Sequence, residues 1–135
     1  MSDCIFCKIR DGQIPSSKVY EDNHTFAFMD LNPVNKGHVL VVPKAHSENI
    51  LDAKEEDLSR VLVSAKQVGK AIIKATKADG LNASINNNKA AGQVVFHLHM
   101  HLIPRFAGDG LTHWPHKNYD QGEMDEWAKK IRENL

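Results

Sequence analysis

The run of residues 97–103 constrains this chain most, because three histidines alternate there with single hydrophobic residues. Successive side chains of a β-strand point to opposite faces, so the run predicts a strand with His97, His99 and His101 on one face. The other face, directed into the core, would carry Leu98, Met100 and Leu102. Neighbouring histidines would lie about 6.6 Å apart along the strand, and the outer pair about 13 Å apart. Two neighbours could share one metal ion but all three could not, so we predict different roles for them.

Three interpretations of the histidine strand differ in their chemistry. The histidines could be surface imidazoles of an amphipathic strand, a metal site of the His-x-His type, or the nucleophilic centre of an enzyme. Three imidazoles in register, beside a polar loop over residues 86–92, disfavour the surface interpretation. Neutral imidazole has a pKa of about 6.5, so near pH 7 it can attack phosphorus and form a covalent nucleotidyl-histidine that water later cleaves. His99 has a histidine on each side to assist with protons and charge, and it is the predicted nucleophile.

The bulk composition limits the classes of partner. The 135 residues suit a single domain over residues 1–135, and 17 basic residues balance 17 acidic ones. A net charge of zero argues against charge-driven binding to nucleic acid or to an anionic membrane surface. No apolar run approaches the roughly 20 residues that span a bilayer, and no basic and apolar leader opens the sequence. We therefore expect a cytoplasmic protein that binds neither nucleic acid nor membrane.

The hydrophobic pattern predicts an α+β domain with a mostly antiparallel sheet. Strands are predicted over residues 18–21, 24–29, 38–42, 81–86 and 94–103, and helices over residues 55–77 and 124–134. Asp52 and Glu55 resemble a capping box before the long helix, and Gly80 supplies its predicted stop. The second helix has one apolar face, formed by Met124, Trp127, Ala128 and Ile131.

Cys4 and Cys7 form a Cys-x-x-Cys pair and are the two cysteines of the chain. In a cytosolic protein this spacing indicates metal binding or redox chemistry before a structural disulfide. Two small buried residues would give the same pattern. No further pair of ligands follows at the spacing of a conventional zinc finger, so the residues alone leave these alternatives open.

The histidine run closely resembles the signature of the histidine-triad (HIT) family, His-φ-His-φ-His-φ-φ, in which φ is hydrophobic. Further segments resemble family landmarks in the family's order: residues 5–9, Ile14-Pro15, residues 28–31, Gly37-His38, residues 43–46 and Gly92-Gln93. The resemblance covers the chain from about residue 4 to residue 115. It implies a five-stranded antiparallel sheet with two helices, and a homodimer in which the sheet continues from one subunit into the other.

The resemblance implies a nucleotide hydrolase or transferase that acts on the α-phosphate of AMP conjugates, such as phosphoramidates and adenylates, through a covalent intermediate on His99. His101 resembles the histidine that contacts phosphate and leaving-group oxygens, and the backbone carbonyl of His97 would orient the His99 ring. Two other functions stay open: hydrolysis of diadenosine polyphosphates, and nucleotide binding or scaffolding with incidental activity. The intact triad favours an enzyme, because binding alone does not need His99.

The resemblance also implies which residues hold a purine nucleotide. Asp30 resembles the carboxylate that accepts both ribose hydroxyls, while Asn86, Gly92 and Gln93 would hold phosphate. The base pocket would be lined by Phe6, Ile9, Ile14, Phe28 and Leu31. Val94 departs from the pattern, because that position often has a hydroxyl side chain that helps the leaving group.

A zinc-containing subset of the family places one ion on two cysteines, on the histidine of Pro-Lys-x-His and on the first histidine of the triad. The corresponding residues are Cys4, Cys7, His46 and His97, a set that suits tetrahedral zinc. Such an ion would have a structural role, because it would tie the N-terminus to the catalytic strand. The segment around Trp114 resembles one that approaches the partner subunit's site, although about twenty further residues follow it here. Packing of Trp114 in a dimer interface or in the core stays an open alternative.

Overall fold

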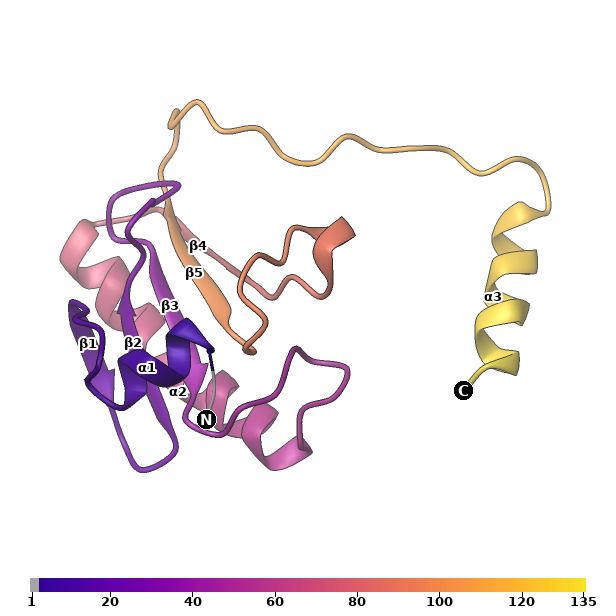
Figure 1. Cartoon of the computed structure of the whole chain (residues 1–135). Coiled ribbons are helices and arrows are strands. Elements are labelled where there is room, and N and C mark those ends of the chain that lie inside the picture. Colours follow the sequence, from indigo (N-terminus) through magenta and orange to yellow (C-terminus); the bar gives the residue numbers. More distant parts are fainter. Residues whose placement is uncertain (1–2) are drawn as a thin grey trace.

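The computed structural model describes residues 3–135, in which five strands form one sheet beside three α-helices and a 3₁₀ turn (Figure 1). In chain order the elements are α1 (Ile5–Arg10), β1 (Lys18–Glu21), β2 (Thr25–Met29), β3 (Val39–Pro43), α2 (Glu55–Thr76), β4 (Gly80–Ser84), η1 (Lys89–Ala91), β5 (Met100–Arg105) and α3 (Glu123–Glu133). The predicted fold class is confirmed, and α1 is an additional helix that the hydrophobic pattern did not predict. None of the helices in residues 3–135 has the length and apolar character to cross a membrane.

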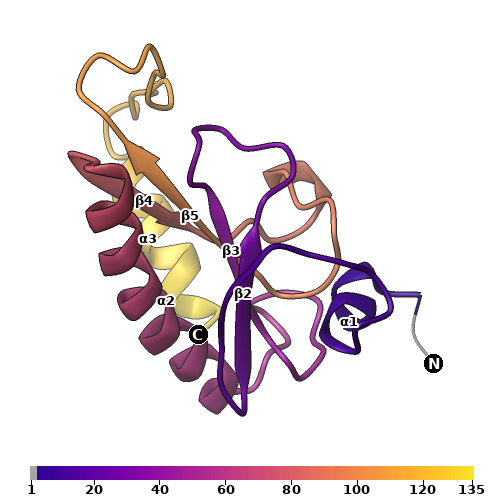
Figure 2. The ribbon, with the colours of Figure 1, turned by 90° about the vertical axis from the view of Figure 1, so that its left-hand side faces the viewer.

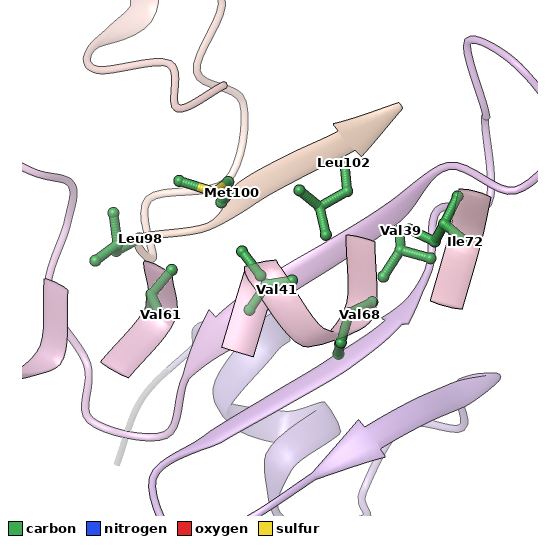
Figure 3. Close-up of a cluster of buried hydrophobic side chains, with 10 residues drawn as sticks. Val39, Val41, Val61, Val68, Ile72, Leu98, Met100 and Leu102 are labelled. Atoms are coloured by element: carbon green, nitrogen blue, oxygen red, sulfur yellow. The ribbon is translucent and has the colours of Figure 1, made fainter. Parts of the chain in front are cut away.

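Neighbouring strands all run antiparallel, in the order β1-β2-β3-β5-β4, so β1 and β4 are the edges of the sheet. The helix α2 lies against one face of the sheet and α1 against the other, as Figure 2 shows. Between α2 and the sheet lies the main core, where β3 and β5 side chains meet those of the helix (Figure 3). The labelled members of this core are Val39, Val41, Val61, Val68, Ile72, Leu98, Met100 and Leu102.

The ends of α2 differ from the predicted signals, although its bounds agree closely with the prediction. The N-cap residue is Lys54, which makes no side-chain capping bond, and the acidic first turn instead favours the positive end of the helix dipole. The predicted capping box is wrong, because the Asp52 carboxylate accepts two backbone N–H groups of the preceding loop. The helix ends where Lys77 adopts a left-handed conformation, with φ 59°. Gly80 is therefore not the stop but the first residue of β4.

The predicted strand over residues 94–103 begins later than expected. β3 pairs only with residues 100–102, so the preceding segment has no strand partner. The Leu98 N–H instead donates to the carbonyl of Ser47 in the loop after β3, at 2.9 Å. The alternation of side chains still holds, because Leu98, Met100 and Leu102 are buried in the core. His97 and His99 therefore lie in the irregular segment that leads into β5, and not within the sheet itself.

The same strand also continues beyond its predicted end at Pro104. The Pro104 carbonyl accepts the side-chain amide of Asn35 at 2.8 Å, while Leu81 of β4 pairs with Pro104 on the other side. On the Asn35 side there is no neighbouring strand that needs an N–H from this position. Proline is therefore tolerated within β5, as it is on strand edges generally.

The chain beyond β5 forms an arm that leaves the sheet. Residues 111–120 have no regular secondary structure, and they carry α3 to a position beyond the β4 side of the sheet (Figure 1). The predicted terminal helix is confirmed as α3, but none of its residues is buried. No other element in residues 3–135 therefore buries its apolar face.

Candidate functional site

His99 lies just before β5, beside the helix α1. Its ring Nδ1 is 2.7 Å from the carbonyl oxygen of His97, to which it donates a proton. In a neutral ring this leaves Nε2 unprotonated and able to act as a nucleophile. The Phe6 ring meets the His99 ring edge-on, with centroids 5.0 Å apart, and so limits its rotation. These contacts support the predicted orientation of His99 by the His97 carbonyl.

His101 is oriented by His38, a residue for which the sequence predicts no specific role. The Nδ1 of His38 accepts the backbone N–H of Val34 at 3.1 Å, so the proton of its neutral ring is on Nε2. That Nε2 lies 2.9 Å from Nδ1 of His101, which accepts the proton. The His101 ring is then protonated on Nε2 and can donate to a bound substrate. The landmark Gly37-His38 was the signal in the sequence that could have identified this residue.

Burial keeps the rings of this site uncharged at neutral pH. It lowers the pKa of His99, which is only 7% exposed. Burial, with the neighbouring rings of His99 and His38, lowers the pKa of His101 to about 4. Burial also lowers the pKa of His38, while the carboxylate of Asp30, 3.5 Å from its Nε2, acts to raise it. A neutral imidazole is the form that nucleophilic attack requires.

Asp30 lies at a cavity beside His101. One carboxylate oxygen accepts the Asn32 N–H at 2.8 Å, and the other is the oxygen near His38. A carboxylate has about four lone-pair sites, so Asp30 can accept further hydrogen bonds. The cavity has a volume of about 490 Å³, and its lining includes Asp30, His38, Ser84, Asn86, His101 and Trp114.

Four of the five predicted base-pocket residues come together next to His99. Phe6 and Ile9 of α1 are buried in one cluster with Phe28 of β2, and Ile14 packs against that cluster. The rings of Phe6 and Phe28 meet edge-on, with centroids 5.4 Å apart. Leu31 is 94% exposed and lies outside the cluster. Aromatic and aliphatic surfaces of this kind commonly line the sites of flat apolar ligand groups.

The predicted phosphate loop is organised around Gln93. Its side-chain oxygen accepts the Asn88 N–H at 2.8 Å and the Asn49 side-chain amide at 3.2 Å, while its amide nitrogen donates to two backbone carbonyls. These bonds use the whole amide, so Gln93 shapes the loop, and a direct contact with phosphate stays a prediction. Gly92 has φ 94°, and a Cβ there would meet the Asn86 side chain at 3.5 Å. The loop thus brings the Gly92 backbone close to Asn86.

Cys4, Cys7, His46 and His97 converge from three distant parts of the chain, with one ligand atom each, all within 4.8 Å of one another. The Nδ1 of His97 lies 3.3 Å from Cys4 Sγ, 3.5 Å from Cys7 Sγ and 3.1 Å from His46 Nδ1. A tetrahedral zinc ion with ordinary bonds to sulfur and nitrogen spaces its ligand atoms about 3.3–3.8 Å apart. The four residues therefore fit such an ion.

The ring of His97 is also held in the tautomer that can bind a metal ion through Nδ1. Its Nε2 donates to the carbonyl of Pro43 at 2.8 Å, so its Nδ1 presents a lone pair to the cysteines. Burial lowers the pKa of His97 to about 4, which keeps the ring neutral. A carbonyl that fixes the tautomer of a histidine in this way is typical of metal-ligating histidines.

Sequence comparisons agree with this geometry. The HIT domain family matches residues 11–108 of the chain. The protein Hit of Bacillus subtilis is 49% identical over 110 residues, which cover 81% of this chain and 76% of that protein. An adenylylsulfatase of Arabidopsis thaliana is 40% identical over 110 residues, covering 82% of this chain and 56% of that protein. An adenosine 5′-monophosphoramidase of Candida albicans is 35% identical over 141 residues, which cover 99% of this chain and 92% of that protein.

Solved structures agree as well. A crystal structure of a Streptococcus mutans protein superposes with a TM-score of 0.93 and 44% identity, covering 99% of this chain and 86% of that chain. A zinc-bound histidine triad family protein of Mycobacterium smegmatis superposes with a TM-score of 0.79 and 30% identity, covering 98% of each chain. The first superposition spans nearly the whole chain, and so it includes the arm and α3. The chain therefore belongs to the HIT domain family.

Proposed function

We propose that this protein hydrolyses nucleotide conjugates in which the α-phosphate of AMP is joined to an amine, a sulfate or a similar leaving group. The observation that carries the proposal is the hydrogen bond from His99 Nδ1 to the His97 carbonyl. It makes Nε2 the unprotonated nitrogen of a buried, neutral ring whose direction is fixed, as attack on phosphorus requires. The names of the Arabidopsis adenylylsulfatase and the Candida monophosphoramidase support the same substrate class.

The reaction would have two steps through a covalent intermediate. His99 Nε2 attacks the α-phosphorus, an N–P bond forms, and the bond from phosphorus to the leaving group breaks with its electron pair on the leaving group. Water then attacks phosphorus, and the N–P bond breaks with its electron pair returned to Nε2. The proton that water loses balances the proton that the leaving group gains, with solvent as the carrier. The Nε2–H of His101 donates to a phosphoryl or leaving-group atom and stabilises the negative charge in both steps.

The residues around the triad would hold the AMP portion. The Asp30 carboxylate would accept the ribose hydroxyls, because it lies beside the histidines and has hydrogen-bonding capacity left. The cluster of Phe6, Ile9 and Phe28 would contact the base, since it adjoins His99 through the Phe6 ring. Asn86 and the Gly92 backbone would contact the phosphate. Leu31, at 94% exposed, would take part only if it closed over the bound base.

We also propose a structural zinc ion on Cys4, Cys7, His46 and His97. The spacing of the four ligand atoms and the hydrogen bond from His97 to Pro43 support the site. Zinc bound there would hold α1, and with it Phe6, against the catalytic segment. Four protein ligands complete a tetrahedral shell, so the ion would orient the chain and take no part in catalysis.

A homodimer with a sheet continued across β4 is the third part of the proposal. β4 is an edge strand, and an edge strand presents unpaired backbone groups to another chain. An apolar groove beside it is lined by Leu62 and Val63 of α2 and by Leu81 and Ala83 of β4. Leu62 and Val63 are more than half exposed, so a second copy would bury apolar surface as well as pair strands.

Turnover of a small substrate panel tests the proposed activity. Adenosine phosphoramidate and adenylyl sulfate should be cleaved by the native protein, and His99→Ala should lose this activity by several orders of magnitude yet still bind AMP. His24→Ala replaces an exposed histidine outside the site and is the matched control. Preferential cleavage of diadenosine polyphosphates would favour that alternative, and AMP binding without turnover would favour a scaffold. Near-native turnover by His99→Ala would refute the mechanism.

A further inference from the structure

The helix α3 exposes an apolar stripe with no buried residue, although the Lys130 ammonium group of the same helix lies 4.8 Å from the centre of the Trp127 ring. Met124, Trp127, Ala128 and Ile131 recur at helical spacing, and Met124, Trp127 and Ile131 are 61%, 49% and 60% exposed. The helix has only 11 residues, and isolated helices shorter than about 12–15 residues are marginal in water. The stripe therefore needs a surface to pack against if α3 is to contribute a stable helix.

The described residues also leave an apolar groove open on the α2 side of the sheet, near β1. Its volume is about 290 Å³, and it lies between Val19, Tyr20 and Met29 of the sheet and Ala71 and Ala75 of α2. α2 packs mainly over β3 and β5, and one helix is about as wide as two strands. The β1 end of this sheet face is therefore left for a second helix.

Within one chain, the groove lies near the β1 edge of the sheet, whereas α3 lies beyond the opposite edge, which is β4. Figure 1 shows the arm passing beyond β4 and setting α3 on the far side of that edge, whereas the groove adjoins β1 at the other edge. The space beyond β4 is where a second copy would lie if the sheet continues across that strand. The arm would thus deliver α3 to the body of the second copy.

We propose that α3 of each subunit docks in the groove between β1 and α2 of a second copy of this chain. The apolar stripe around Trp127 would fill the groove, and the charged residues of α3 would face solvent. The exchange is reciprocal, so a dimer with two-fold symmetry would contain two such contacts. This contact is separate from the pairing of β4 strands, although the position of the second copy rests on the proposed dimer.

A disulfide cross-link tests the placement directly. Ala71→Cys in the groove combined with Ala128→Cys in the stripe should give a covalent dimer on mild oxidation of the full-length protein. The matched control combines Ala71→Cys with Lys129→Cys, on the opposite face of α3, and should cross-link far less. It also measures any background from Cys4 and Cys7. A cross-link within one chain, or no difference from the control, would overturn the proposal.

The oligomeric state gives the second readout. Trp127→Asp with Ile131→Asp should raise the dimer dissociation constant in sedimentation experiments by at least about tenfold. Lys129→Ala with Glu133→Ala, on the polar face, should leave it unchanged. An unchanged dimer in the first variant would show that subunits associate through β4 alone and that α3 does not dock. That result would leave the β4 dimer and the catalytic proposal standing.

Discussion

His99 donates its Nδ1 proton to the carbonyl oxygen of His97 across 2.7 Å, and this one bond joins the two proposed sites of the protein. The ring of His97 belongs to the cluster of potential zinc ligands, and its carbonyl orients the predicted nucleophile. Any movement of the His97 backbone would therefore change the direction of His99 Nε2. The arrangement predicts that loss of the metal site lowers activity indirectly, through the position of His99.

The zinc proposal predicts a loss of stability when one thiolate is removed. Cys4→Ser should contain much less zinc than the native protein, which should contain about one ion per chain. Its melting temperature should fall by about 5 °C or more, because the binding free energy of the ion adds to folding. Metal analysis and calorimetry measure both quantities. Native protein that is free of zinc after purification without chelators would speak decisively against the site.

The hydrogen bond between His38 and His101 predicts an effect on kcat that can be separated from an effect on stability. His38→Leu removes the donor that fixes the His101 tautomer, and kcat should fall roughly tenfold, as for the loss of one hydrogen bond of ordinary strength. His38→Gln offers an amide donor and an acceptor in similar places and should recover part of the rate. A purely structural role of His38 would lower stability in His38→Leu without this rescue of kcat.

The lowered pKa of His101 predicts how stability depends on pH. The folded protein holds this ring neutral down to about pH 4, because burial lowers its pKa, whereas the unfolded chain takes up the proton near its ordinary value of 6.5. Between these values the unfolded state binds more protons, so the free energy of unfolding should decrease as pH falls from about 6.5 to about 4. His101→Gln should show a smaller decrease over this window in chemical denaturation. Parallel curves for the two proteins would contradict the assignment.

Asp30 predicts discrimination between nucleotides by their ribose hydroxyls. A hydrogen bond to a charged group contributes about 1.5–3 kcal/mol, so dideoxy-AMP should bind at least about tenfold more weakly than AMP. Asp30→Ala should lose most of this difference, and Asp30→Asn should keep part of it. Titration calorimetry with both ligands measures the ratio. Equal affinities in the native protein would rule out Asp30 as the ribose ligand.

Sequence periodicity was sufficient to predict those strands and helices whose buried residues recur at a regular spacing. The valine run of β3 and the helical spacing of α2 each have a period that burial enforces, and their bounds agree with prediction to within one or two residues. The short helix α1 does not have such a period. It has six residues and depends on burial of Phe6 and Ile9 and on a bond from the Cys7 N–H to the Cys4 side chain. Such dependence on distant partners is not visible in a local pattern.

Some features of the candidate site could be predicted from the sequence, and others could not. The alternation of the triad predicts that histidines and core residues separate, and the contacts of His99 agree with the role inferred from the resemblance. The predicted start of β5 was wrong, because the strand begins where its residues can pair with β3, which is distant in sequence. The role of His38 likewise depends on a contact over 63 positions of sequence with His101. Pairings of this kind require the fold.

In the proposed mechanism, His99 forms a covalent bond to the α-phosphorus of the nucleotide. Rapid quenching during turnover of adenosine phosphoramidate, followed by peptide mass spectrometry under neutral conditions, should detect an acid-labile adenylyl group on the peptide that contains His99. Fragmentation should place the group on His99 and not on His97 or His101. The adduct should be absent from His99→Ala and should decay at a rate compatible with kcat. Full turnover with no adduct on His99, at a time resolution shorter than one catalytic cycle, would contradict the account.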